Sequence, residues 1–215
     1  MAGAIASHQR LLGIAPGAKL LAVRAFGVDE KGAQGTSMNI VKGLEWAVAQ
    51  GAKIINMSFA GPRDPILQQA IKKLSDDGII LIAAAGNAGP KSPPLFPGAD
   101  ANVIAVSATD INDKVYKNAN RGKYIAIAAP GVDILVPAPD GGYQLTTGTS
   151  VAAAHISGVV ALLKERNPQL KAADVRNILS ASAKNIGPVK TDIGAGLVDP
   201  MQALTKAGPQ SVAAR

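Results

Sequence analysis

The chain has 215 residues and a formal net charge of +7, and 47% of its residues are hydrophobic. This length suits one domain with a sizeable core. The absence of cysteine excludes disulfide scaffolds, cysteine–zinc sites and cysteine nucleophiles. Basic residues are scattered and not interleaved with aromatic ones, so we expect a solvated surface and no nucleic-acid partner. No apolar run has the length of a membrane span, and residues 1–6 lack the features of a secretory signal.

Apolar patterns predict alternating strands and helices along the chain. In chain order these are strand 19–26, helix 37–50, strand 53–59, helix 64–77, strands 79–85, 103–108, 124–128 and 134–136, and helices 150–166, 172–182 and 199–206. Asp64 is the predicted N-cap of the second helix, with Pro65 in its first turn. This alternation predicts an α/β fold, with a mostly parallel sheet and helices on both faces.

Gly148-Thr149-Ser150 leads directly into an apolar helix. Ser150 is therefore a candidate nucleophile, since free N–H groups at a helix start favour developing negative charge. The alternative is an ordinary N-cap serine. Asn87 follows a predicted strand, where ligands of parallel sheets bind. It is either a hydrogen-bond donor to such a ligand or a loop asparagine in a left-handed turn.

Six segments resemble, in order and spacing, the subtilisin-like serine proteases (subtilases, peptidase S8 family). They are Gly13 to Leu20, Ile55 to Ala60, Ala84 to Asn87, Ala129 to Val132, Gly148 to Gly158 and Gly194 to Val198. The resemblance implies the three-layer subtilisin-like fold and a serine endopeptidase acting on polypeptides. It also implies a secreted or periplasmic location, although the compartment stays open.

The resemblance assigns roles to individual residues. Ser150 matches the nucleophile, and Asn87 matches the side-chain donor of the oxyanion hole. Two backbone strips would flank the substrate, and Leu95 would lie at the base of the primary specificity pocket, beside a proline bond that is often cis in the family. The strip residues are Ser58, Phe59 and Ala60 on one side, and Ala84, Ala85 and Gly86 on the other.

The chain also departs from the family pattern. No His-Gly-Thr motif or strand-end aspartate precedes Ser150, and His8 and His155 match no catalytic position. We therefore expect residues 1–215 to be an incomplete catalytic domain that is inactive alone, lacks N-terminal strands and needs the missing N-terminal segment of the same domain as a partner. The missing strand would leave a gap between 19–26 and 53–59.

Two further expectations follow from the resemblance. The family's strongest calcium loop corresponds here to the short, basic stretch 7–12, so we predict no such site, and we assign no metal ligands and no cofactor. A weaker calcium site elsewhere stays open. The alternative to an enzyme is a non-catalytic pseudoprotease, a peptide-binding or interaction domain that uses the strip at Ser58 to Ala60.

Overall fold

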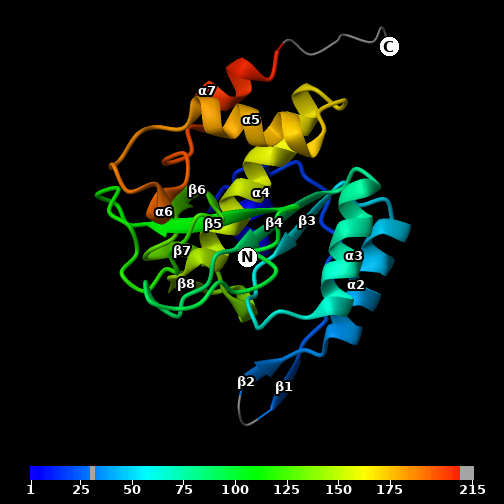
Figure 1. Ribbon diagram of the computed structural model, residues 1–215. Coiled ribbons are helices and arrows are strands. Elements are labelled where there is room, and N and C mark those ends of the chain that lie inside the picture. Colours follow the sequence, from blue (N-terminus) through cyan, green and yellow to red (C-terminus); the bar gives the residue numbers. More distant parts are fainter. Residues whose placement is uncertain (30–31, 209–215) are drawn as a thin grey trace, which may run out of the picture.

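Four parallel strands form the central sheet, in the spatial order β3-β4-β5-β6 (Figure 1). They are β3 (Ile54–Met57), β4 (Ile80–Ala84), β5 (Val103–Thr109) and β6 (Ile125–Pro130). The structure, a computed structural model, describes residues 1–29 and 32–208. Every residue of β4 and β5 is buried, as expected for inner strands that are covered on both faces.

Helices cover the two faces of the sheet and make a three-layer α/β fold. Ile80 and Ile82 of β4 pack in the core that contains α4 (Thr149–Arg166), α5 (Ala172–Ser182) and α7 (Pro200–Lys206). Leu81 and Ala83 pack in the core on the opposite face, with α2 (Ser37–Ala49) and α3 (Pro65–Asp76) side by side (Figure 1). This alternation of side chains confirms the predicted α/β class.

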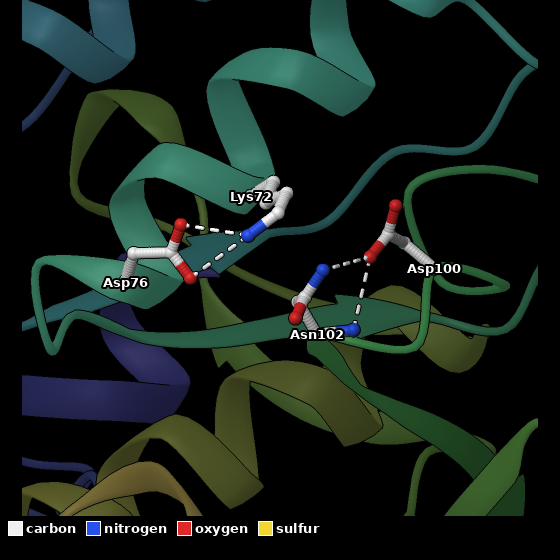
Figure 2. Close-up of polar contacts among 4 residues, drawn as sticks. All are labelled: Lys72, Asp76, Asp100 and Asn102. Atoms are coloured by element: carbon white, nitrogen blue, oxygen red, sulfur yellow. Dashed lines mark hydrogen bonds and ion pairs between the residues drawn. The ribbon is translucent and has the colours of Figure 1, made fainter.

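The predicted start of α3 is confirmed in detail. The Asp64 carboxylate accepts a hydrogen bond from the Leu67 N–H at 2.9 Å, and Pro65 occupies the first helical position. Figure 2 shows Lys72 near the other end of α3, paired with Asp76 one turn later. Both side chains are more than 60% exposed, so this pair adds little stability.

A short turn places the start of β5. Asp100 is buried, and its Oδ1 accepts hydrogen bonds from the backbone N–H of Asn102 at 2.9 Å and from its side-chain amide at 3.0 Å (Figure 2). The Gln68 side chain of α3 reaches the other Asp100 oxygen at 3.4 Å. The turn before β5 is thereby tied to the helix layer above it.

Smaller elements surround this centre. They are α1 (Ala2–Ala6), the hairpin β1 (Gly27–Asp29) and β2 (Gly32–Gln34), the hairpin β7 (Ile134–Pro137) and β8 (Tyr143–Thr146), the 3-10 turn η1 (Pro139–Gly141) between its strands, and α6 (Lys190–Ile193). The strand predicted at 134–136 exists but pairs antiparallel with β8, outside the central sheet. Sequence reasoning missed β1, β2, β8 and α6.

The prediction of a strand at 19–26 is wrong. These residues form no helix or strand, and β3 is an edge of the sheet with β4 as its single neighbour. Leu20 and Val23 are 43% and 41% exposed, although the apolar pattern predicts a buried strand. The physical reason is pairing, because an apolar segment becomes a strand only where a neighbouring backbone edge completes its hydrogen bonds.

Candidate active site

The ends of β3 and β4 meet the start of α4 at one edge of the sheet. A pocket of about 290 Å³ opens there. Its walls contain seven of the nine residues predicted for the site, together with Ala88 and Thr149: Phe59, Ala60, Ala84, Gly86, Asn87, Leu95 and Ser150. The pocket therefore gathers segments that are more than 90 residues apart in the sequence.

Helix α4 begins one residue earlier than predicted and carries Ser150 in its first turn. Its N-cap is Gly148, whose φ of 151° is a conformation that favours glycine. Gly148 is held by a backbone hydrogen bond from its N–H to the Gly131 carbonyl at 2.7 Å. The backbone N–H of Ser150 has no acceptor among the described residues. A free donor and the positive end of an 18-residue helix therefore lie beside the Ser150 hydroxyl.

The Asn87 side chain is oriented by its neighbour Thr149. Its Oδ1 accepts two hydrogen bonds from Thr149, one from the backbone N–H and one from the hydroxyl, both at 3.0 Å. The Thr149 hydroxyl also accepts the Gly86 N–H at 3.2 Å. Because Oδ1 is occupied in this way, the Asn87 Nδ2 donors are left for the pocket, and Gly148 without a side chain leaves room for them.

Gly86 has no tolerance for a side chain at this point. Its φ is +109°, and an added Cβ would lie 2.7 Å from the Asn120 amide nitrogen. Asn120 in turn fixes the loop, since its Oδ1 accepts the Ala88 N–H at 2.8 Å and its own N–H donates to the Gly86 carbonyl at 3.0 Å. The Asn87 amide is therefore presented by a backbone that is hydrogen-bonded on both sides.

A chain of polar side chains lies behind Ser150 and was missed by sequence reasoning. The Ser157 hydroxyl donates to Asn56 Oδ1 at 3.0 Å, and Asn56 Nδ2 donates to the Ser58 hydroxyl at 2.8 Å. The Ser58 hydroxyl donates to the Ser150 carbonyl at 2.9 Å. Ser150 completes the link, because its own hydroxyl donates to the Ser58 carbonyl at 3.1 Å. The available signal was Asn56, a polar residue within an otherwise apolar strand.

Two loops close the walls of the pocket. Gly61 and Phe96 exchange backbone hydrogen bonds of 2.8 and 2.9 Å, and the Phe96-Pro97 bond that follows Leu95 is cis. Ala85 is placed differently from its neighbours. It is completely buried and does not line the pocket, and its carbonyl accepts the Tyr124 hydroxyl at 3.2 Å.

Neither histidine is hydrogen-bonded to Ser150. His155 lies in α4, and its Nδ1 donates to the Pro130 carbonyl at 2.8 Å. Burial lowers the pKa of His155, an effect that the Pro130 hydrogen bond partly opposes. His8 is exposed, and its Nδ1 contacts the Ala6 carbonyl at 3.2 Å. The Ser150 hydroxyl itself is bonded to a carbonyl, which cannot accept its proton for catalysis.

The described residues were also searched for metal-ion sites and for membrane-spanning helices. Residues 1–29 and 32–208 contain no group of three or more histidine, aspartate or glutamate side chains arranged to hold a metal ion. Within the same part of the chain, none of the helices combines the length and apolar character needed to cross a membrane.

The chain belongs to the subtilase family, whose model (Peptidase_S8, "Subtilase family") matches residues 1–203. Among curated proteins, Subtilisin BL of Lederbergia lenta is 36% identical over 203 residues, which are 93% of this chain and 74% of that protein. Alkaline elastase YaB of Bacillus sp. (strain YaB) is also 36% identical over 203 residues, with 93% of this chain and 52% of that protein covered. Family membership makes this a serine-type peptidase fold with polypeptide as the family's substrate.

Solved structures show the same architecture. Fervidolysin from Fervidobacterium pennivorans, a keratinolytic enzyme related to subtilisin, superposes with a TM-score of 0.86 and 30% identity, covering 98% of this chain and 36% of that one. A mutant of the protease domain of PatA gives a TM-score of 0.83 and 32% identity, covering 95% and 78%. These similarities confirm the predicted subtilisin-like fold.

Proposed function

We propose that this chain carries the nucleophile and oxyanion half of a serine endopeptidase site. Ser150 is the nucleophile, and the Asn87 amide with the Ser150 N–H forms the oxyanion hole. The observation that supports this most directly is the double hydrogen bond from Thr149 to Asn87 Oδ1, which leaves the amide donors for the pocket beside Ser150. A surface serine or a loop asparagine would need no such orientation.

The substrate would bind as an extended strand between the two predicted strips. The strip at Ser58 to Ala60 and the strip at Ala84 to Gly86 flank the pocket, and the side chain before the cleaved bond would enter it. Leu95 fills part of that pocket, so we expect a preference for modest apolar side chains over large aromatic ones. The preference would be partial, because one methylene group is worth only about 1–3 kcal/mol in a hydrophobic pocket.

The proposed chemistry also requires a general base and a carboxylate in addition to Ser150 and Asn87. A base must accept the Ser150 proton as the hydroxyl oxygen attacks the scissile carbonyl, and must return it to the leaving amine when the acyl-enzyme forms. A carboxylate must orient that base. Neither histidine of the chain is placed for this role, so we propose that residues 1–215 are a catalytically incomplete domain whose base and acid come from a further N-terminal segment of the same domain. The mechanism uses protein groups alone and no cofactor.

A pseudoprotease would use the same substrate strips without the chemistry. We favour the enzyme because strand addition at Ser58 to Ala60 needs neither a hydroxyl at Ser150 nor an oriented Asn87 amide. For the location we propose the outside of the cell, because one relative, 33% identical over 189 residues, is named minor extracellular protease Epr of Bacillus subtilis. That match covers 86% of this chain and 29% of Epr.

A fusion protein tests the proposal. The part of Subtilisin BL that has no counterpart in this chain is joined ahead of Met1, and turnover of a chromogenic peptide is measured. We expect turnover that is abolished in Ser150→Ala and lowered about 10²–10³-fold in kcat by Asn87→Ala, the loss known for the equivalent donor in subtilisin. Gln202→Ala, on α7 away from the pocket, is the matched control and should have no effect.

Two results would overturn the proposal. A folded fusion protein that binds peptide but gives no Ser150-dependent turnover would favour the pseudoprotease. Turnover that survives Asn87→Ala at full rate would remove the oxyanion role. The preference set by Leu95 is tested in the same fusion protein, by comparing kcat/KM for Ala, Leu and Phe before the cleaved bond with and without Leu95→Gly, and an unchanged ranking would refute it.

A further inference from the structure

Two polar residues behind Ser150 have no part in the chemistry proposed above. Asn56 lies in β3, between the buried apolar residues Ile55 and Met57, and Ser157 lies about two turns after Ser150 in α4. Ser157 is only 4% exposed. Because burying a polar side chain is unfavourable unless it is hydrogen-bonded, the partners of these two residues decide what they do.

The hydroxyl of Ser157 has one proton and two acceptors within reach. They are Asn56 Oδ1 at 3.0 Å and the Ala153 carbonyl, one turn earlier in α4, at 2.9 Å. A serine inside a helix often donates to the carbonyl four residues earlier. Ser182 of α5 does so, with its hydroxyl 2.7 Å from the Ile178 carbonyl. Ser157 differs from Ser182 because a side chain of the central sheet also accepts its proton.

The Asn56 amide transmits the direction of this hydrogen bond to Ser58. With Oδ1 bound by Ser157, Nδ2 donates to the Ser58 hydroxyl at 2.8 Å. A hydroxyl that accepts a hydrogen bond keeps its own proton for another acceptor, and here that acceptor is the Ser150 carbonyl at 2.9 Å. The Ser150 hydroxyl donates in return to the Ser58 carbonyl at 3.1 Å. This reciprocal pair of hydrogen bonds between the two serines therefore depends on which way the Asn56 amide faces.

We propose that Asn56 is a positioning residue for Ser150, and that Ser157 sets the orientation of the Asn56 amide. Ser157, Asn56 and Ser58 form a relay of hydrogen bonds that ends on the backbone of Ser150. The inference rests on the proposed function for the role of Ser150 as nucleophile, but not for the coupling between Asn56 and Ser150. Support of this kind matters to a nucleophile, because a misplacement of about 1 Å costs up to about 10²-fold in rate.

Fastening α4 to the sheet would be a different and purely structural role. Apolar packing already fixes the helix, since Ala152, Ile156 and Val160 are completely buried in the core that α4 shares with β4, β5 and β6. The relay instead acts on a single carbonyl, that of the residue that carries the candidate nucleophile. A positioning role therefore predicts an effect on the environment of Ser150 and on the rate, with an unchanged apparent affinity for substrate.

The coupling is measured in this chain without reference to activity. Asn56→Asp keeps the shape of the side chain, but at pH 8 it offers acceptor oxygens alone, so it accepts protons from both Ser157 and Ser58. We expect the Ser58 proton to leave the Ser150 carbonyl, and the ¹³C NMR resonance of that carbonyl to shift upfield because it loses a hydrogen bond. Ser157→Ala frees the Asn56 amide and should shift the same resonance in the same direction, so it serves if Asn56→Asp unfolds.

The matched control is Ser182→Ala, which removes another buried helical serine that donates to the carbonyl four residues earlier. It should leave the Ser150 carbonyl resonance where it is in the parent chain. A resonance that stays at the parent position in the folded Asn56 and Ser157 variants would overturn the proposal. An equal shift in Ser182→Ala would also overturn it, because the effect would then not depend on the relay.

The consequence for catalysis is measured in the fusion protein described above. We expect Asn56→Asp and Ser157→Ala to lower kcat about tenfold with KM unchanged, and Ser182→Ala to change neither. Parent kcat in both relay variants, or a change in KM alone, would overturn the positioning role. A fusion protein without Ser150-dependent turnover would reject the proposed function instead, and the carbonyl resonance would still decide whether Asn56 is coupled to Ser150.

Discussion

Strand β4 and residues 19–26 are both rich in leucine, isoleucine, valine and alanine, yet β4 is a buried strand of the sheet and residues 19–26 form no strand. β4 is paired on both sides and all its residues are buried. Residues 19–26 have no backbone partner among the described residues, and Leu20 and Val23 are over 40% exposed. The difference lies in the neighbours, because a strand needs a backbone edge as well as an apolar sequence.

The same contrast divides the candidate active site. The side with Asn87, the proposed oxyanion donor, follows β4, and Thr149, Asn87 and Gly86 there are joined by hydrogen bonds of 3.0 to 3.2 Å. On the side of β3, the polar groups near Ser150 are hydrogen-bonded to one another, and the Ser150 hydroxyl donates to the Ser58 carbonyl. One side of the candidate site therefore adjoins β4, which is paired on both sides, and the other side adjoins β3, which is paired with β4 alone.

The largest expected effect concerns turnover by the isolated chain. We expect kcat about 10⁶-fold below that of a complete subtilisin, because removing the catalytic histidine of subtilisin costs about that factor. The measurement is hydrolysis of casein and of a chromogenic peptide by purified chain, with Ser150→Ala as the control for contaminating protease. Robust activity that Ser150→Ala abolishes would show that residues 1–215 contain a base and would contradict the proposal that the catalytic site is incomplete.

Core substitutions in the two apolar regions should differ strongly. Ile82→Ala removes a fully buried side chain from the inner strand β4 and should lower the free energy of unfolding by about 2–5 kcal/mol. Leu20→Ala, at a position that is 43% exposed, should change it by no more than about 0.5 kcal/mol. Urea denaturation of both variants measures this, and similar losses would mean that residues 19–26 are as well packed as β4.

Substitutions at Thr149 test the side of the candidate site that adjoins β4. Thr149→Val keeps the shape but removes the hydroxyl that donates to Asn87 and accepts the Gly86 N–H. Because Thr149 is completely buried, the unpaired groups left behind should cost about 1–3 kcal/mol of unfolding free energy. Thr149→Ser retains the hydroxyl and should recover most of this loss. If the valine variant proves to be the more stable of the two, the hydrogen bonds are not what holds Asn87.

The smallest expected effect is a pH dependence from His155. Burial lowers its pKa in the folded chain, so the unfolded chain binds its proton more readily. Its contribution to stability is complete above the unfolded value of about 6.5 and declines as the pH falls through that value toward the lower, folded pKa. Urea midpoints at pH 7.5 and 5.5 should therefore differ less in His155→Gln than in the parent chain. His8→Gln is the control at an exposed site, and an equal reduction there would refute the assignment.

The sequence predicted those parts of the molecule that depend on local or periodic signals. Asp64 and Pro65 at the start of α3, the parallel strands and the long helix after Gly148 follow from capping, alternation and apolar period. The prediction of a strand at 19–26 failed because a strand needs a neighbouring backbone edge to pair with, and no local sequence pattern shows whether that edge is present. The polar chain through Asn56 and Ser157 joins residues 101 positions apart, so only the packing of α4 against β3 reveals it.

Hydrogen exchange of the isolated chain tests the central contrast most directly, since it reads the backbone pairing of both regions in one sample. We predict that amides of residues 20–24 exchange close to their intrinsic rates, while those of β4 at residues 80–84 and of α4 at residues 159–163 are protected by several orders of magnitude. Strong and equal protection of all three segments in a monomer would contradict this account, because the backbone of residues 20–24 would then be paired as β4 is.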